Sequence, residues 1–240
     1  VPALETRGRH FQRRLGLGGE PNAGLFFLGS NAGAIVAVDP RIRHSGADGS
    51  DDGSPCTIFR LPEAHTKKIN TLSLHAHLLA SASTDASVRI WDVRKMSLDP
   101  GGIKGASRLQ PLATIPLSAS SQSALWAPHL GPDNALLVTT FDSRLFIYRN
   151  LGRSGSGTDA QPCPSITIRH DTKTGRWVVP FRAVWAAGGS GVLVGGMKRT
   201  ADVYDAANGT RFSAFSSEDL TAIPSRNAAH PTLPVLACGT

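Results

Sequence analysis

The 240-residue sequence predicts an all-β fold, a partial β-propeller assembled from repeats of one small antiparallel sheet. Three observations support this prediction. Short segments alternate apolar and polar residues with a period of two, which is typical of half-buried strands. Similar groups of such segments recur along the chain, as they do in propellers. Stretches rich in Gly, Ser and Asp lie between the groups and are expected to be solvated connections.

The clearest repeat unit is the segment AHTKKINTLSLHAHLLASASTDASVRIWDVR, residues 64–94. It holds three strand-like stretches, INTLSL, LLASAS and SVRIWDV, which are separated by short polar turns. This segment resembles the WD40 repeat, and Trp91-Asp92 supplies the WD pair. The resemblance places four residues at the positions of the hydrogen-bonded structural tetrad of a WD40 blade: His65, Ser83, Asp85 and Trp91.

The same frame recurs less completely in three further segments. The position of the WD40 Trp is taken by Val38, Tyr148 and Tyr204. Tyr148 again follows an acid, Asp142, but Lys198 stands in the place of the acid before Tyr204. These positions recur about every 55 residues, whereas a minimal blade takes ~40–45, so each repeat is expected to carry an inserted loop.

The repeats divide the chain into a basic, unassigned N-terminal segment, residues 1–22, and a partial propeller, residues 23–240. The expected blades are residues 23–60, 61–110, 111–162, 163–215 and an incomplete 216–240. The resemblance implies a ring of about seven blades. The sequence supplies four and a half, begins at Val1 and stops within a strand, so it is expected to be part of a longer protein.

The amino-acid composition restricts the possible functions less strongly than the repeats restrict the fold. Hydrophobic residues make up 40% of the chain, enough for a folded core, and no apolar run is long enough to span a membrane. The formal net charge of +7 favours an anionic partner such as nucleic acid. Cys56, Cys163 and Cys238 lie far apart without a CxxC pair, so we expect no disulfide framework and a reducing, intracellular setting.

The motifs of common enzyme classes are missing from the sequence. It has no GxSxG, phosphate-binding loop, HExxH or dinucleotide-binding glycine motif, so we expect no enzyme, no cofactor and no small-molecule substrate. His75 and His77 stand two residues apart at the end of a strand, without a third candidate ligand. They are therefore interpreted as loop or edge histidines, and no metal site is expected.

A more specific resemblance lies in the sequence of the segments that connect the repeats. The runs IRHDTKTGRWVVPFRAVW, GGMKRTADVYD and LTAIPSRNAAHPTLPVLACGT, together with KKINTLSLHAHLLASASTDASVRIWDVR, resemble the damage-binding WD-repeat family called "changed mutation rate" in yeast and WD-repeat protein seventy-six in animals. The match covers most of residues 60–240. It implies a nuclear, chromatin-associated protein that binds DNA, preferentially UV-damaged DNA, in the DNA damage response.

The resemblance extends to the WD-repeat subunit of the UV-damaged-DNA-binding complex, in which a hairpin between two blades inserts side chains into the minor groove. Aligning the strand VVPFRAVW places that insertion at Gly175-Arg176-Trp177. Gly175 stands where the relative has an aromatic residue, and Trp177 could supply a ring one or two positions later. Two interpretations of Trp177 stay open: a wedge into damaged DNA, or a ring packed on a neighbouring blade.

Basic residues are expected to gather on one rim of the propeller. In a WD40 blade, the loops between blades and the turns between the second and third strands emerge on the same face. The candidate DNA-binding residues on this face are Lys67, Lys68, Lys173, Arg176, Trp177, Lys198 and Arg199. Cations gathered in this way bind phosphates through counterion release. The alternative interpretation of each single Lys is a solvated surface charge.

A second candidate site lies on the other face. Trp91-Asp92-Val93-Arg94 is a WDxR sequence, and Val38-Asp39-Pro40-Arg41 echoes it. In WD-repeat substrate receptors of cullin-4 ubiquitin ligases, the Arg of this motif contacts the ligase adaptor. The candidate adaptor-binding residues are therefore Asp92, Arg94, Asp39 and Arg41. The alternative is a structural pair between Asp92 and Arg94, and the competing hypothesis to DNA binding is a protein-interaction scaffold or ligase substrate receptor.

Overall fold

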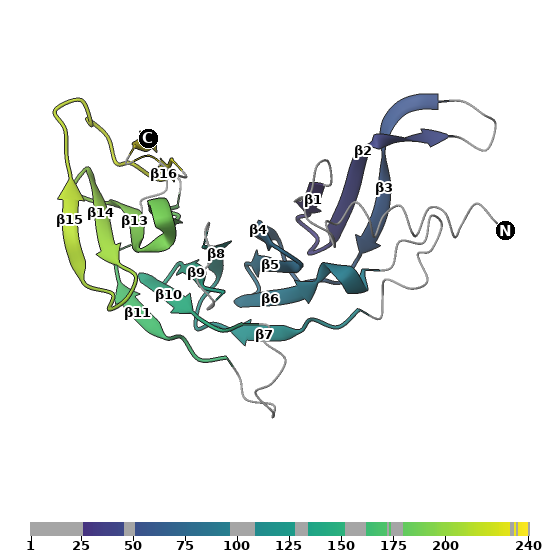
Figure 1. Ribbon diagram of the computed structural model, residues 1–240, viewed down its shortest axis with the longest axis horizontal. Helices are drawn as coiled ribbons and strands as arrows, with labels where there is room; N and C mark the ends of the chain where they lie inside the picture. Colours follow the sequence, from purple (N-terminus) through teal and green to yellow (C-terminus); the bar gives the residue numbers. More distant parts are fainter. Residues whose placement is uncertain are drawn as a thin grey trace.

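The computed structural model describes residues 26–45, 51–96, 109–127, 134–151, 162–171, 173, 180–230, 233 and 235–239. In these residues the chain forms five antiparallel sheets, which follow one another in sequence order. Figure 1 shows the sheets side by side along an open arc, with β1, β4, β8 and β16 on its inner side. The all-β, partial-propeller fold predicted from the sequence is confirmed.

Each sheet is an antiparallel meander. The first contains β1 (Phe26–Gly29), β2 (Ile35–Ser45) and β3 (Asp51–Leu61). The second contains β4 (Ile69–His75), β5 (Leu78–Ser83), β6 (Ser87–Asp92) and β7 (Ala113–Pro116), with the short 3-10 helix η1 (Val93–Lys95) after β6. The third contains β8 (Ser121–Trp126), β9 (Leu136–Thr140), β10 (Arg144–Tyr148) and β11 (Ile166–Arg169).

The last two sheets complete the described chain. The fourth contains β12 (Val184–Trp185), β13 (Gly191–Gly196), β14 (Thr200–Asp205) and β15 (Arg211–Phe215), with the 3-10 helix η2 (Ala187–Gly189) after β12. The fifth contains β16 (Arg226–Ala229) and β17 (Leu236–Gly239). Neither helix among the described residues is long and apolar enough to cross a membrane.

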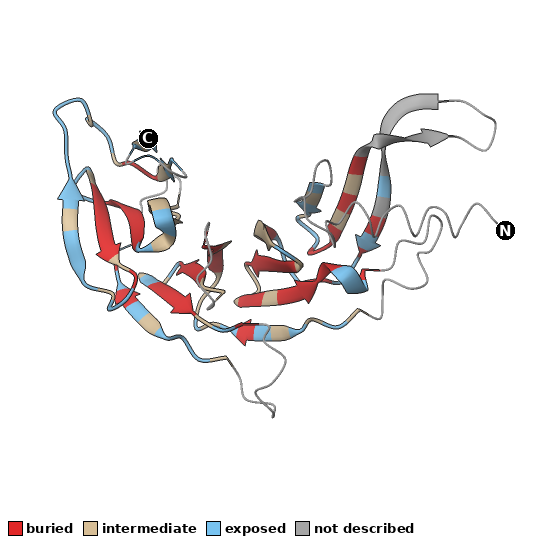
Figure 2. Cartoon of the chain, in the orientation of Figure 1, coloured by how far each residue is buried: buried red, intermediate tan, exposed pale blue. Residues whose placement is uncertain are grey.

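The core lies between neighbouring sheets, because each sheet buries both faces. Along β5, Leu78 and Ala80 pack toward the third sheet, whereas Leu79 packs toward the first. Along β9, Leu136 packs toward the second sheet and Leu137 toward the fourth. This alternation follows from the two-residue period of a strand, and it explains why both strands are apolar almost throughout. Figure 2 shows the buried residues concentrated in these central strands.

The inner strands have free backbone edges, which polar side chains of the preceding sheet satisfy. The backbone N–H groups of Ala124 and Trp126 in β8 donate to the hydroxyls of Thr71 and Ser73 in β4, at 3.0 and 3.1 Å. Similarly, Ala183 N–H donates to the Thr139 hydroxyl at 3.1 Å. An unpaired buried N–H group is costly, so these hydroxyls fix the contact between sheets.

Two boundaries differ from those expected from the sequence. Strand β7 belongs to the second sheet and β11 to the third, although they lie beyond the expected blade ends at residues 110 and 162. In both sheets this outermost strand comes after the long inserted loop, where the sequence offers no strong repeat. The Gly/Ser/Asp-rich stretch 44–55, expected as a connection, lies partly in β2 and β3, which pair Ser45 with Asp51 and Arg43 with Pro55. The segment 1–22 lies outside the described residues.

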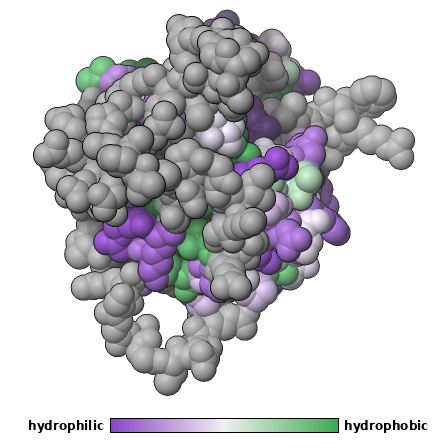
Figure 3. All heavy atoms as spheres, turned by 90° about the vertical axis from the view of Figure 1, so that its right-hand side faces the viewer, coloured by the Kyte–Doolittle hydropathy of each residue, from purple (hydrophilic) through white to green (hydrophobic). Residues whose placement is uncertain are grey.

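The surface beside the first sheet mixes hydrophobic and hydrophilic residues (Figure 3). Phe26 and Leu28 of β1 are more than half exposed in the described chain. Their strand pairs with β2 through Phe26 opposite Val38 and Leu28 opposite Val36. The inner edge of the first sheet is therefore apolar.

Candidate nucleic-acid interface

One end of the sheets carries two kinds of loop: the turns between successive inner strands, residues 30–34, 84–86, 141–143 and 197–199, and the connections that lead into the next sheet, residues 62–68, 117–120 and 170–173. Backbone hydrogen bonds join them. His65 N–H donates to Gly33 O at 2.9 Å, and Thr84 N–H donates to Lys68 O at 3.0 Å. His170 N–H donates to Ser143 O at 3.1 Å. These segments therefore form one surface, which we call the loop rim.

The turns of the loop rim share one backbone conformation. One residue of each turn has a positive φ: Gly33 (82°), Ala86 (62°), Ser143 (65°) and Arg199 (59°). This left-handed region is favourable for glycine and costs other residues free energy. A Cβ at Gly33 would lie 2.0 Å from His65 O, so this position requires glycine. In the fourth sheet the same conformation is occupied by an arginine.

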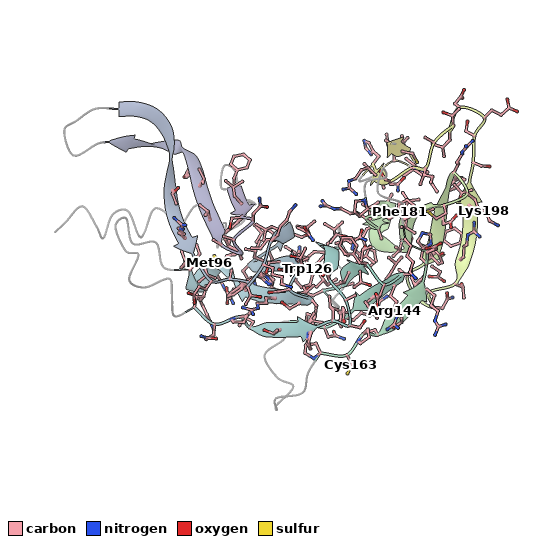
Figure 4. All side chains as sticks on the ribbon, turned by 180° about the vertical axis from the view of Figure 1, so that it is seen from behind. Met96, Trp126, Arg144, Cys163, Phe181 and Lys198 are labelled. Carbon is pink, nitrogen blue, oxygen red and sulfur yellow. The ribbon has the colours of Figure 1, made fainter. Side chains whose placement is uncertain are left out.

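The described cations of the predicted site lie on the loop rim. Lys67 and Lys68 come from the connection between the first two sheets, Lys173 from the one after β11, and Lys198 and Arg199 from the turn after β13. All five side chains are exposed, and within the described chain none forms an ion pair with a carboxylate. Figure 4 labels Lys198. The predicted contacts Arg176 and Trp177 lie outside the described residues.

The loop rim also carries exposed apolar side chains that the sequence analysis missed. Phe141 and Met197 open the turns of the third and fourth sheets and are 43% and 38% exposed. In the third sheet Phe141 is followed by Asp142, which pairs with Arg144 at 3.6 Å. The turn of the third sheet therefore contributes no unpaired cation. The described cations form two groups on either side of it, Lys67 with Lys68, and Lys173 with Lys198 and Arg199. An apolar residue within a polar turn was the signal that could have drawn attention to Phe141.

The structural tetrad contains Ser81, and its assignment to Ser83 was wrong. The Trp91 indole N–H donates to Ser81 Oγ at 2.9 Å, and Ser81 Oγ lies 2.7 Å from His65 Nε2. His65 Nδ1 lies 2.9 Å from Asp85 Oδ2. Both serines lie on the face of β5 that carries Leu79, the residue opposite Trp91, and Ser81 is one step nearer to it. Ser83 is buried and donates to Lys67 O at 3.2 Å.

The tetrad positions the cationic connection before β4. Burial lowers the pKa of His65, which is neutral, donates from Nδ1 to Asp85 and accepts from Ser81 at Nε2. Burial alone would raise the pKa of Asp85, but hydrogen bonds from Ser87 and His65 lower it to about 2. The ionised Asp85 also accepts the backbone N–H of Thr66 at 3.2 Å. The residue before Lys67 is thereby tied to the core.

The fourth sheet reaches a similar arrangement with different residues. The Tyr204 hydroxyl donates to His170 Nδ1 at 2.9 Å, and His170 Nε2 donates to Gly195 O at 2.7 Å. An acid is present, but it is Asp202 of β14, 3.8 Å from His170 Nδ1 and paired with Arg211 at 2.7 Å. Lys198, which stands at the turn position of the acid in the WD40 frame, faces solvent.

The Arg199 conformation yields a first testable prediction. Arg199→Gly is expected to raise the free energy of unfolding by about 0.5–1 kcal/mol, because glycine adopts a positive φ without strain. If Arg199 contacts a phosphate, as the sequence predicts, the same change is expected to lower the affinity for duplex DNA about 8-fold near 0.1 M salt. Arg199→Ala is the matched control, because it loses the charge but keeps the strain. Equal unfolding midpoints for the Gly and Ala variants in urea would contradict the conformational argument.

The WDxR residues lie at the opposite end of the sheets. Asp92 is buried and accepts two hydrogen bonds from the Arg94 guanidinium, at 2.9 and 2.7 Å, and one from the Arg94 backbone N–H at 3.0 Å. The guanidinium of Arg94 remains on the surface, with its side chain 45% exposed. Asp39 is buried, whereas the side chain of Arg41 lies outside the described residues. Asp92 and Arg94 therefore form a structural pair.

The histidine pair of the β4–β5 turn has a packing role for one of its members. The His75 ring contacts the Trp126 ring edge-on, with 6.2 Å between centroids. Burial lowers the pKa of His75. No group of three or more His, Cys, Asp or Glu side chains that could hold a metal ion occurs in the part of the chain that the structure describes.

Comparison with known proteins was made at the levels of family, sequence and fold. No family model matches the chain. It is 34% identical over 198 residues to DNA damage-binding protein CMR1 of Phaeosphaeria nodorum, covering 76% of this chain and 35% of that protein. It is 32% identical over 185 residues to DNA damage-binding protein CMR1 of Chaetomium globosum and 30% identical over 191 residues to cmr1 of Aspergillus oryzae, covering 72% of this chain and 34% of each protein.

The fold comparison agrees with the sheet order. A chain of the crystal structure of the mitotic checkpoint complex superposes with a TM-score of 0.55, at 16% identity, over 81% of this chain and 50% of that chain. The chain spans about a third of the length of the curated relatives it matches. The resemblance predicted from the sequence is confirmed: this chain is a homologue of the WD-repeat proteins named DNA damage-binding protein CMR1.

Proposed function

We propose that the protein carrying this chain binds DNA through the loop rim, preferentially at UV damage, and acts in the nucleus on chromatin in the DNA damage response. One observation carries the proposal: five exposed Lys and Arg side chains, with no carboxylate partner among the described residues, lie on one rim of a chain whose relatives are named for damage-DNA binding. The proposed function is binding, and none of its steps requires catalysis.

The chemistry of the loop rim suits a phosphate backbone. A Lys or Arg that already pairs with a carboxylate gains little from a phosphate, because it exchanges one anion for another. The side chains of Lys67, Lys68, Lys173, Lys198 and Arg199 have no such partner in the described chain, so each can release a counterion from DNA. Contacts of this kind position a protein on DNA without reading its sequence.

Damage preference is assigned to the connection after β11, which contains Lys173, Arg176 and Trp177. An apolar side chain inserted between bases must unstack them, at a cost of a few kcal/mol, and a lesion has already weakened the stack. Trp177 is proposed as that side chain, and Arg176 as a neighbouring phosphate contact.

The test compares binding of the intact protein to one duplex before and after UV irradiation. The wild type is expected to prefer the irradiated duplex, and Trp177→Ala to lower that preference more than it lowers the affinity for the intact duplex. Arg176→Gln is the matched control and is expected to lower both affinities alike. If Trp177→Ala lowered the affinities for the two duplexes equally, Trp177 would not be the inserted side chain. Absence of DNA binding by the wild type would overturn the proposed function.

Adaptor binding is a second candidate function, which the exposed guanidinium of Arg94 favours. This surface lies at the opposite end of the sheets from the loop rim, so the two partners would not compete. Arg94→Glu is expected to abolish co-purification of the cullin-4 ligase adaptor while DNA affinity stays within about 2-fold, because a single remote charge contributes little. Unchanged co-purification would exclude this role for Arg94 and leave Asp92–Arg94 as a structural pair.

A further inference from the structure

Two arginines meet on the inner side of the arc, away from the predicted cations. Arg182 lies in the segment that leads into β12, and its Nη2 donates to the backbone carbonyl of Asn70 in β4 at 3.2 Å. Asn70 in turn donates from its side-chain amide to Ser121 O in β8 at 2.7 Å. The first of these arginines therefore joins the innermost strands of the second, third and fourth sheets.

The second arginine reaches the same backbone segment from the fifth sheet. Arg226 is the first residue of β16, and its Nη1 donates to Pro180 O at 2.5 Å. Pro180 stands two residues before Arg182. The guanidinium of Arg226 thus binds the backbone just before Arg182, and the charge of Arg182 acts on it. Figure 1 shows β4, β8 and β16 on the inner side of the arc.

The charge of this pair is unbalanced. Neither Arg182 nor Arg226 forms an ion pair with a carboxylate among the described residues, and each donates only to backbone carbonyls. Burial lowers the pKa of both arginines, and the charge of Arg182 lowers that of Arg226 further. Two partly buried cations that approach each other are stabilised by a counter-anion. Most of the five N–H donors of each guanidinium are still available for one.

Two residues that follow members of this cluster in the sequence have unpaired amide atoms among the described residues. Gln122 follows Ser121 in β8, is only 2% exposed, and neither its amide nitrogen nor its amide oxygen has a hydrogen-bond partner. Asn227 follows Arg226, and its amide oxygen is also unpaired. A buried amide without a partner costs free energy, so a ligand that supplied one would be stabilised.

We propose that Arg182 and Arg226 bind one phosphate group of the DNA that lies on the loop rim. This inference rests on the proposed function. Planar guanidiniums bind phosphate through two parallel hydrogen bonds, which lysines cannot do. The site adjoins the loop rim, because Asn70 lies two residues after Lys68, and Ile69 N–H donates to Ser30 O in the neighbouring turn at 3.1 Å. DNA held at the loop rim can therefore place one phosphate here.

The experiment uses the intact protein and two probes, a short undamaged DNA duplex and inorganic phosphate. The double variant Arg182→Gln/Arg226→Gln is expected to bind the duplex about 8-fold more weakly near 0.1 M salt and to lower the salt slope by ~0.9, the loss of one phosphate contact. Lys95→Gln, which removes an exposed charge at the opposite end of the sheets, is the control and should keep the wild-type slope. Inorganic phosphate is expected to raise the melting temperature of the wild type and not that of the double variant.

The possible results separate the phosphate site, its assignment to DNA and its bidentate geometry. A wild-type slope in the double variant, with no phosphate effect on the wild type, overturns the inference even if the protein binds DNA. Phosphate stabilisation that requires both arginines, with unchanged duplex affinity, overturns the assignment to DNA and leaves a site for free phosphate. If the Gln variant does not fold, Arg182→Lys/Arg226→Lys keeps both charges and is expected to keep the wild-type salt slope while binding the duplex about 3-fold more weakly. Wild-type affinity in the Lys variant overturns the bidentate site.

Discussion

Replacing Lys67, Lys68, Lys173 and Lys198 together by Gln is expected to weaken binding of duplex DNA about 10³-fold near 0.1 M salt. Each of these side chains is exposed and has no carboxylate partner in the described chain. If each contacts one phosphate, the variant loses four released counterions. The melting temperature is expected to stay within about 2 °C, because none of the four amines contributes to the core.

The control removes one charge from the opposite end of the sheets. Lys95 lies in η1, which is held beside the β4–β5 turn by the Val93 N–H to His77 O hydrogen bond at 2.9 Å, far from the turn at residues 84–86. Lys95→Gln is expected to change the affinity less than 2-fold. If each rim lysine contributed no more than Lys95, the loop rim would not be the DNA-binding surface.

Asp85→Asn is expected to lower the free energy of unfolding by about 3 kcal/mol. The carboxylate accepts hydrogen bonds from His65, Thr66 and Ser87, and its side chain is 7% exposed. The amide nitrogen of Asn cannot accept a hydrogen bond, so at least one of these groups loses its acceptor. The buried His65 also loses its charged partner. Urea unfolding measures the loss, and Glu218→Gln, an exposed acid, should change it by less than about 0.5 kcal/mol. A loss that small for Asp85→Asn would show that the tetrad contributes little.

The same groups give a pH dependence of stability with a defined sign. Burial lowers the pKa values of His65 and His170 below their ordinary value of 6.5, so the unfolded chain binds protons that the folded chain does not. The melting temperature is therefore expected to fall as the pH drops below 6.5. Asp85, with its pKa lowered from 3.8 to about 2, adds a second loss between these values. A melting temperature that is constant from pH 7 to pH 5 would contradict the neutral, buried state of the two histidines.

The repeating sheet could be predicted because its signal is local. Alternating apolar strands and the WD pair recur in order, and packing on both faces of each sheet requires that pattern. The choice between Ser81 and Ser83 could not be made in this way, since both lie on the same face of β5. Which of them the Trp91 indole reaches depends on the β5–β6 register. A strand pattern predicts a face, but it does not predict a register.

The sites that involve several sheets could not be predicted from local sequence patterns. Asp202 replaces the turn acid from a neighbouring strand, and nothing in the spacing before Tyr204 distinguishes it from an ordinary strand residue. Arg182 reaches Asn70 across 112 positions of sequence, and only the order of the sheets brings them together. The lysines of the loop rim were predictable because the fold fixes which turns share a face. Their division by Asp142 and Arg144 required the structure.

The central claim, that phosphates are bound by the loop rim, is tested most directly by the salt dependence of DNA binding. The slope of log affinity against log salt concentration is measured for the intact wild type and for the variant in which Lys67, Lys68, Lys173 and Lys198 are replaced by Gln. The wild-type slope is expected to be steeper by ~3.6, about 0.9 for each lost phosphate contact. Parallel lines for the two proteins would contradict the claim.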